Sequence, residues 1–435
     1  MRTAFHKTLS TLALGWIFLI LLPFYINAQE CEMRKRDFEM VTEFLNSKRT
    51  IDWAEKHAYL KLSGDIKAQF LRRIEKNNGH YLRGHNNFHN ESLNFPFPLN
   101  PDTYEAVLNT RWDYKCGRSW MAGYLQFDNH MGTRFKPTVC IDDPNGCSGS
   151  GECDDICIKR AYAGYNFIDC DDLVFDLEMG RRPMYTIFDS RIEFHARFDG
   201  LLFKLSKIVK DKGKFYANGG PFVVDFRVNH YAYIIETGVL DFYQSNFDIK
   251  YSFIDWRKHG KNRCLILDAQ GWRFKNSQLS LAYNINPKYI PAVCKKARLY
   301  GAFLYNHTAH GLDKFDNVIT ITDFRKQNDA WYAGLIIGEV RKKGDWSVDI
   351  NYQYVRAQAI PECDMHGIGR GTVAEPFLKT GLGKGNYKGW HFEGLYAVTD
   401  KLSLDFLYEF SNEIEKKIGG SVLYHRYEFD VIHAF

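Results

Sequence analysis

The final sixteen residues, Gly420 to Phe435, alternate between apolar and polar side chains with a period of two. Apolar residues hold every second position apart from His425 and His433, namely Leu423, Tyr427, Phe429, Val431 and Phe435. Arg426, Glu428 and Asp430 lie between them. Because successive side chains of a β-strand point to opposite faces of a sheet, this pattern predicts a strand with one apolar and one hydrated face.

The same period recurs along the chain, most clearly over 345–354 and 401–410. Aromatic residues make up 16% of the sequence, with 33 Phe and 26 Tyr against 12 Pro, yet the mean hydropathy is only −0.38. In a transmembrane β-barrel only one face of each strand meets lipid, so apolar residues are needed only at every second position. The pattern therefore predicts an all-β transmembrane antiparallel barrel.

Sixteen strands are expected between residues 58 and 435, joined by alternating short turns and long loops, which is typical of this architecture. The first begins at Ala58, and the others span about 104–114, 121–127, 159–167, 173–182, 198–208, 215–228, 231–243, 247–256, 278–285, 297–305, 330–340, 346–354, 390–398, 402–410 and 420–435. Sixteen strands enclose a lumen too wide for wall side chains to fill. The even number brings both ends of the barrel to the periplasmic side.

The first 28 residues have the pattern of a secretory signal peptide. Arg2 and Lys7 precede an apolar run over 12–25, and Ala28 offers a small-residue cleavage site. The alternative is an uncleaved membrane helix, although the run is shorter than the roughly 20 residues that a bilayer requires. Loss of Arg2 and Lys7 lowers the formal charge from +5 to +3, too small a positive charge to indicate nucleic-acid binding.

Residues 29–57 form the one stretch with a helical period. Phe38, Val41 and Leu45 recur at spacings of three and four among charged residues. We expect a short periplasmic helix that packs at the mouth of the barrel. The alternative is an oligomerisation coiled coil, for which fewer than three heptads are present.

The last strand, which ends on an aromatic residue, resembles the closing strand of bacterial outer-membrane barrels. The resemblance implies that Tyr427, Phe429, Val431 and Phe435 are the signal read by the barrel-assembly machinery. The stretch 180–205, with GRRPMYTIFDSRIEF and RFDGLLF, is similar to cysteine-containing porin-like outer-membrane proteins of chlamydia-related bacteria. That resemblance implies an outer-membrane location in a Gram-negative envelope and passive uptake of small hydrophilic solutes.

In sixteen-stranded general porins, the loop after the fifth strand folds into the lumen and narrows it. Here that loop covers 183–196, and the candidate constriction residues on it and on its flanking strands are Arg181, Arg182, Asp189, Arg191, Glu193, Arg197 and Asp199. Carboxylates facing arginines across a constriction create a transverse field that selects among ions. The alternative is that these groups pair with one another at the base of the loop and meet no solute.

Ten cysteines are present, and in an oxidising compartment the expected state is disulfides. Cys140, Cys147, Cys153 and Cys157 share one loop, so two local bridges of unspecified pairing are expected. No Cys-x-x-Cys pair supports a zinc site, and the neighbouring acidic residues lack the spacing of a calcium loop. The six scattered cysteines, Cys31, Cys116, Cys170, Cys264, Cys294 and Cys363, are candidates for disulfide links to other envelope proteins.

The sequence contains none of the common enzyme motifs, such as Gly-x-Ser-x-Gly, His-Glu-x-x-His or a phosphate-binding glycine loop. We therefore expect a non-enzymatic porin with no metal or other cofactor. Its expected partners are outer-membrane lipid, small solutes and the barrel-assembly machinery, with a homotrimer as the usual assembly of general porins. The competing hypotheses are a surface adhesin, a disulfide-linked structural protein of the envelope and, less favoured, a barrel enzyme.

Overall fold

The computed structural model describes residues 51–55, 58–83, 102–128, 155–225, 230–258, 274–289, 295–309, 327–361, 364–368, 385–416 and 420–435. Eighteen strands form one antiparallel sheet. Sixteen of them make a closed barrel: β2 (Ala58–Asn77), β4 (Asp102–Cys116), β5 (Ser119–Asp128), β6 (Asp155–Asp169), β7 (Leu173–Pro183), β8 (Arg197–Val209), β9 (Gly213–Asp225), β10 (His230–Leu240), β11 (Phe247–Lys258), β12 (Lys275–Ile285), β13 (Ala297–Asn306), β14 (Asp329–Gly338), β15 (Trp346–Val355), β16 (Tyr387–Ala397), β17 (Leu402–Glu413) and β18 (Val422–Ala434). The predicted all-β barrel of sixteen strands is confirmed.

Two short strands lie beside β2. β1 (Ile51–Glu55) pairs with the start of β2, and β3 (His80–Arg83) pairs with its end. The expected helical segment over 29–57 therefore contains five residues of strand, whose backbone groups bond to β2 instead of along a helix. Residues 29–50 lie outside the described part of the chain. In the described part, no helix is long and apolar enough to cross a membrane.

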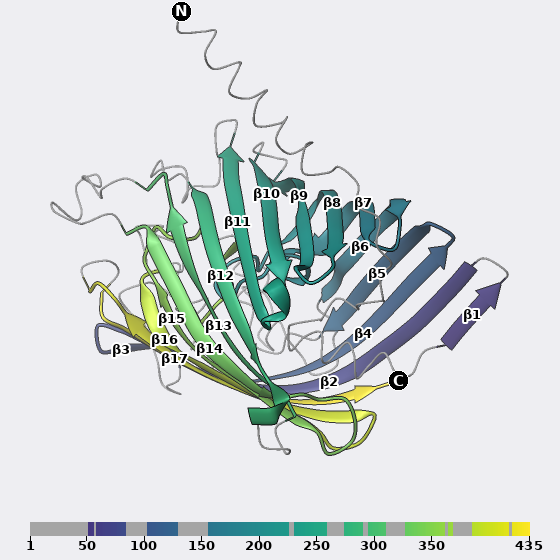
Figure 1. Cartoon of the computed structure of the whole chain (residues 1–435). Coiled ribbons are helices and arrows are strands. Elements are labelled where there is room, and N and C mark those ends of the chain that lie inside the picture. Colours follow the sequence, from purple (N-terminus) through teal and green to yellow (C-terminus); the bar gives the residue numbers. More distant parts are fainter. Residues whose placement is uncertain are drawn as a thin grey trace, which may run out of the picture.

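The barrel closes where β18 pairs with β2 (Figure 1). Thirteen residues of β18, from Val422 to Ala434, lie opposite residues of β2. Beyond them, the Phe435 N–H donates to the Gly64 carbonyl at 3.0 Å, and the Gly64 N–H donates back at 3.2 Å. A Cβ placed on Gly64 would come within 2.5 Å of the Phe435 ring. Gly64 therefore leaves room for that ring on the outer face of the seam.

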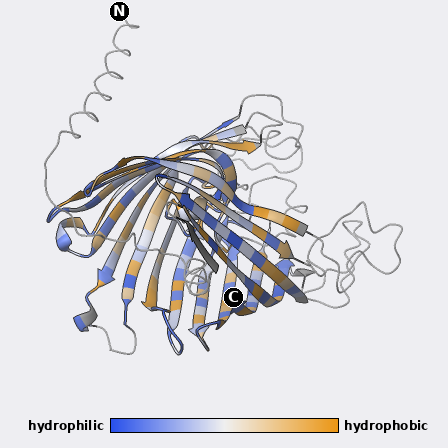
Figure 2. Cartoon of the chain, turned by 90° about the vertical axis from the view of Figure 1, so that its right-hand side faces the viewer, coloured by the Kyte–Doolittle hydropathy of each residue, from blue (hydrophilic) through white to orange (hydrophobic). Residues whose placement is uncertain are grey.

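The two faces of the wall differ in polarity, and the strands show stripes of alternating hydropathy (Figure 2). On β15, apolar and aromatic residues such as Ile350 and Tyr352 are half-buried, whereas Asp349, Asn351 and Gln353 on the opposite face are almost fully buried. Exposed Phe303, Phe406 and Phe429 mark the same outer face on other strands. The outer face is thus apolar and suited to lipid, and the inner face is polar.

Aromatic rings form a continuous row on the outer face between β14 and β18. Ring centroids are 5.5 Å apart between Trp331 and Tyr352, 5.1 Å between Tyr352 and Trp390, and 4.8 Å between Tyr408 and Tyr427. Trp331, Tyr352 and Trp390 lie toward the end of the barrel that carries the long loops. They match the aromatic girdle found at the membrane interface of outer-membrane barrels.

The alternation of short and long connections holds for most pairs of strands, but residues 286–296 between β12 and β13 form a long connection at the end that carries the short turns. Residues 117–118 join β4 to β5, and 170–172 join β6 to β7, at one end of the barrel. At the other end most connections are long, but only residues 226–229 link β9 to β10. The strict alternation expected from the sequence is therefore wrong at these two connections.

We expect Gly64→Val to weaken the β18–β2 seam, because the branched side chain would displace the Phe435 ring and strain the outer face. Overpacking of this kind costs about 1–3 kcal/mol. The measurement is the temperature at which the folded band of the refolded protein disappears in SDS gel electrophoresis. Gly394→Val on β16 is the matched control, because Gly394 has no left-handed backbone and a Cβ there meets nothing within 4 Å. An equal fall of this temperature in both variants would contradict the role of the contact between Gly64 and the Phe435 ring.

Candidate functional site

The connection between β7 and β8 lies against the inner wall of the barrel. It begins with a 3-10 turn (Met184–Thr186), and its apolar side chains Met184, Phe188, Ile192 and Phe194 are completely or almost completely buried. Phe188 packs on inward-facing Phe222, with centroids 6.4 Å apart. We call residues 184–196 the inner loop. Its apolar residues explain why a polar wall also contains buried hydrophobic clusters.

Two hydrophobic clusters hold this loop. Both of its ends, through Met184, Phe188, Phe194 and Ala196, join one cluster with wall residues Phe198, Leu202, Phe222, Ala232, Ile234, Ile254 and Trp256. Between the ends, Ile192 joins a second cluster that includes Leu304, Tyr332, Val355 and Tyr387. The inner loop therefore follows the wall from β8 to β16.

Polar groups fix the middle of the inner loop to β10, β11 and β12. The Asp189 carboxylate accepts from Lys250 Nζ at 2.5 Å, and the Asp189 N–H donates to Glu236 Oε2 at 3.0 Å. Gln278 bonds twice, donating to the Asp189 carbonyl at 2.8 Å and accepting from Ser190 Oγ at 2.7 Å. These groups are inward-facing and buried, so each bond replaces water that the group would otherwise require.

A second segment, from the long connection between β15 and β16, packs on the inner loop. Backbone bonds join the two in both directions, from the His195 N–H to the Asp364 carbonyl at 3.3 Å and from the His366 N–H to the Ile192 carbonyl at 2.8 Å. The Asp364 carboxyl also accepts from the Phe194 and Ala196 N–H groups at 3.1 and 3.2 Å. We call residues 356–361 and 364–368 the latch.

The contact between the inner loop and the latch contains two buried carboxyls. Burial raises the pKa of Glu193, and the Asp364 charge raises it further. Burial likewise raises the pKa of Asp364 to about 7, although the Phe194 and Ala196 N–H donors favour its ionised form. His366 stacks on His195 with centroids 5.2 Å apart, and burial lowers its pKa to about 3, so it is neutral at physiological pH.

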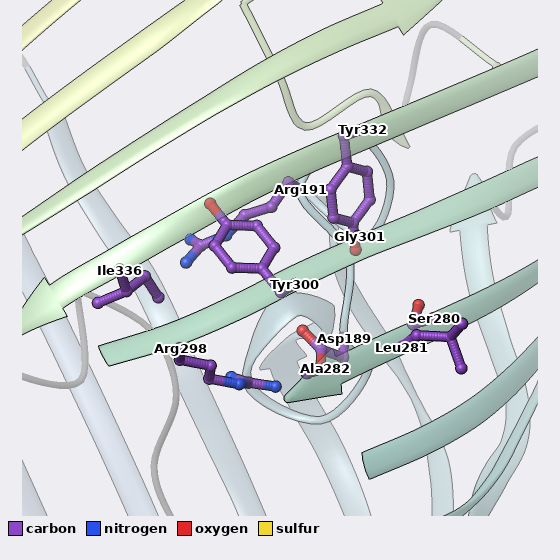
Figure 3. A pocket seen from close by; sticks show the side chains of 10 residues that line it. All are labelled: Asp189, Arg191, Ser280, Leu281, Ala282, Arg298, Tyr300, Gly301, Tyr332 and Ile336. Atoms are coloured by element: carbon purple, nitrogen blue, oxygen red, sulfur yellow. The ribbon is translucent and has the colours of Figure 1, made fainter. Parts of the chain in front are cut away.

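A small polar pocket lies where the inner loop meets β12, β13 and β14 (Figure 3). Arg191 NH2 lies 2.8 Å from Asp349 Oδ2, and its guanidinium lies 5.2 Å from the Tyr300 ring centre. Tyr300 donates its hydroxyl hydrogen to Asp349, and Arg298 faces Asp248 at 3.7 Å. The cavity is only about 10 Å³, near the minimum for one water. The loop and wall therefore meet in a closed polar seam at this point.

The structure separates the candidate constriction residues into two groups. Asp189, Arg191, Glu193 and Arg182 lie on the inner side, each with a partner on the wall. Arg181 and Asp199 instead form a bidentate ion pair at 2.9 and 2.7 Å on the outer face, level with exposed Met179 and Leu201. Arg197 is exposed at the start of β8, two residues before Asp199. Strand alternation decides this division, because neighbouring Arg181 and Arg182 must point to opposite faces.

The sequence analysis identified Arg182 but missed the inner-face residues beside it. A basic row on β4, β7 and β8 stacks on inward-facing aromatics: Arg111 over Tyr124 at 4.6 Å, Arg182 over Tyr162 at 4.4 Å and Lys204 near Trp120 at 5.8 Å. These residues are far apart in sequence and share no motif. Asp364, which holds the latch, was also missed, because only the fold brings it to the inner loop.

The cysteine predictions fall mostly outside the described residues. Cys140, Cys147 and Cys153 lie outside the described residues. Cys157 on β6, Cys116 at the end of β4 and Cys170 in the β6–β7 turn are free thiols. The two local bridges therefore stay a prediction. In the described ranges no group of three His, Cys, Asp or Glu side chains is placed to hold a metal ion.

No protein-family model and no curated protein matches the chain. Solved structures similar to it include OmpF of Salmonella typhi in complex with daunomycin, with 10% identity and a TM-score of 0.48 over 88% of this chain and all of that chain. OprB of Pseudomonas putida has 9% identity and a TM-score of 0.46, covering 86% and 94% of the two chains. The outer membrane channel DcaP of Acinetobacter baumannii has 9% identity and a TM-score of 0.44, covering 88% and 99%.

At these identities and TM-scores below 0.5, the similarities carry no conclusion about this chain. The barrel itself decides the location, because a closed antiparallel barrel with an apolar outer face has all its wall backbone groups paired and can lie in hydrocarbon. The protein is therefore a transmembrane β-barrel of the bacterial outer membrane. The finer similarity to chlamydia-related porins stays a prediction.

Asp364→Ala should loosen the latch, because the buried N–H groups of Phe194 and Ala196 lose their acceptor. Each unsatisfied N–H group destabilises the packed latch by about 1–3 kcal/mol. We expect faster cleavage of the latch by an added protease in the detergent-folded protein, with the barrel retained. Asp211→Ala, in an exposed turn, serves as the control. Identical cleavage rates in the two variants would show that Asp364 does not hold the latch.

The latch should also respond to pH. Asp364 keeps its proton up to about pH 7 in the folded protein, whereas an unfolded Asp loses it near its ordinary value of 3.8. The folded state thus binds more protons in this interval, so stability should fall as the pH rises from about 4 to 7. The raised pKa of Glu193 acts in the same direction. Thermal unfolding of the wild type and of Asp364→Asn at both pH values tests this, and an equal slope in the two proteins would contradict it.

Proposed function

We propose that the protein is a passive channel for ions and small hydrophilic solutes, with the inner loop as its charged constriction. The observation that carries the proposal is a closed barrel of sixteen strands with a polar inner face. Barrels of 16 to 18 strands leave an aqueous channel. The inner loop and latch line one side of the lumen, from β8 to β16, and narrow that channel.

The wall on β4, β7 and β8 carries basic groups that are fixed in ion pairs. Arg111, Arg182 and Lys204 lie on inner positions of β4, β7 and β8 and are held over aromatic rings. Arg111 pairs with Asp65 at 2.6 Å, and Lys204 lies 2.6 Å from Glu178. Rigid charges of this kind keep a fixed field in the channel, because they do not reorient when a solute passes.

The outer face supports the membrane part of the proposal. Outer-membrane lipid is the partner of the exposed apolar residues, and the aromatic row on β14–β18 lies at the loop end of the wall. The assembly machinery, a homotrimer and disulfide links to envelope proteins remain expectations from the sequence.

The test compares two neighbouring arginines in planar bilayers. Arg182→Gln removes a positive charge from the inner wall, so the reversal potential in a KCl gradient should shift toward cation preference, on the order of twofold in permeability ratio. Arg181→Gln removes the same charge from the outer face and should leave the ratio unchanged.

Three results would contradict the proposal. A folded, inserted protein that passes no current has a plugged lumen, and the adhesin or enzyme hypotheses would then be preferred. Equal shifts in the two variants would mean that the inner and outer faces do not differ in their effect on permeating ions. An unchanged ratio in both would remove Arg182 from the constriction.

A further inference from the structure

The outer face of the wall is hollowed between β11 and β16. A groove of about 610 Å³ lies over these strands, and most of the residues that line it are apolar. Its floor contains Gly301 and Ala333, which lie directly opposite one another in the β13–β14 pair. The outward positions beside this pair carry bulky side chains, such as the exposed Leu299, Phe303 and Trp331. Two small residues within a surface of large ones therefore leave a hollow that the chain's own side chains do not fill.

Large apolar side chains form the walls of this groove. They are contributed by all six strands and comprise Phe247, Leu281, Tyr283, Leu299, Leu335, Ile350 and Trp390. A contiguous exposed apolar surface marks an interaction site. Because this face of the barrel lies in hydrocarbon, the groove is open to molecules of the bilayer and closed to solutes of the lumen.

The end of the groove nearest the long loops carries positive charge. Lys388 lies on the same face of β16 as Trp390, two residues nearer the start of the strand, or about 7 Å along it. Lys388 is directly opposite Tyr354 in the β15–β16 pair, and the Arg356 guanidinium lies 5.8 Å from the centre of the Tyr354 ring. Arg356 also faces Asp329 at 3.3 Å. Two cations and one carboxylate give this rim a net charge of +1.

We propose that the groove holds an acyl chain of a phosphorylated lipid of the outer leaflet, with the lipid phosphate at Lys388 and Arg356. The order of groups along the wall matches such a lipid. The cations lie at the loop end, the stacked rings of Tyr354 and Trp331 come next, and the apolar groove continues toward the short turns. Aromatic rings and cations are the groups that meet lipid headgroups at a membrane interface. The site lies outside the lumen, so it does not depend on the proposed channel function.

The test measures lipid binding by native mass spectrometry, in which the detergent-folded protein is titrated with hexa-acylated lipid A. Ala333→Leu fills the floor of the groove, and Lys388→Gln removes a charge from its rim. Each change should raise the dissociation constant of the first bound lipid at least fivefold. The mobility of the unheated protein in SDS gel electrophoresis checks that each barrel is folded. Unchanged binding in both folded variants would overturn the site.

Two control variants separate the groove from the rest of the outer face. Ala163→Leu makes the same change on β6, at an exposed position between the exposed Met121 and Met179. Lys76→Gln removes a lysine charge from the outer face of β2, opposite Leu423. Both controls should bind lipid A as the wild type does. Equal losses in Ala333→Leu and Ala163→Leu would overturn the groove, and equal losses in the two lysine variants would overturn the phosphate assignment.

Further probes distinguish the proposed lipid from other occupants. Lipid A stripped of its phosphates should bind the wild type at least fivefold more weakly, and Lys388→Gln should not weaken that binding further. Lys288 lies in the exposed turn between β12 and β13, at the opposite end of the barrel. If Lys288→Gln weakens binding and Lys388→Gln does not, the occupant is a lipid of the inner leaflet and the proposal is wrong. Dimers of the wild type that Ala333→Leu abolishes would identify a second copy of the chain as the occupant, and would also overturn the proposal.

Discussion

The fold depends on the pairing of every wall backbone group where no water is available. A strand edge in hydrocarbon would leave N–H and C=O groups unsatisfied at several kcal/mol each, so a membrane-spanning sheet has to close. Here β18 closes on β2 over thirteen residue pairs, and the Phe435 and Gly64 backbones extend the ladder past the last strand residue. The position of every inward and outward side chain follows from that closed register.

The second organising feature is that the inner loop and the latch cover part of the polar inner wall. Its polar residues are the kind that water would cover, yet Asp349, Asn351 and Gln353 are buried. The inner loop and the latch replace water with their own backbone and side-chain groups, as the Gln278 and Asp364 contacts show. The lumen is therefore asymmetric, with a covered side from β8 to β16 and a basic side on β4, β7 and β8.

The charged side chains of the lumen are also distributed unevenly. The charged groups of the inner loop are bound to the wall. The electric field in the lumen therefore depends mainly on charged residues of the wall strands, which are far apart in the sequence. The basic row is stacked on aromatic rings, whereas Asp405 lies directly opposite Asp430.

The sequence alone determined the strands, because lipid on one side and water on the other impose a period of two that is visible residue by residue. It thus predicted all sixteen barrel strands, and it located the loop after the fifth. It failed at 51–55, where pairing with β2 replaced the expected helix, and at Arg181, since alternation turns this residue away from Arg182. Which residues meet across the lumen was decided only by the tertiary structure. Contacts such as Asp364 with Phe194, or Asp405 with Asp430, depend on barrel closure and strand register, which no local pattern encodes.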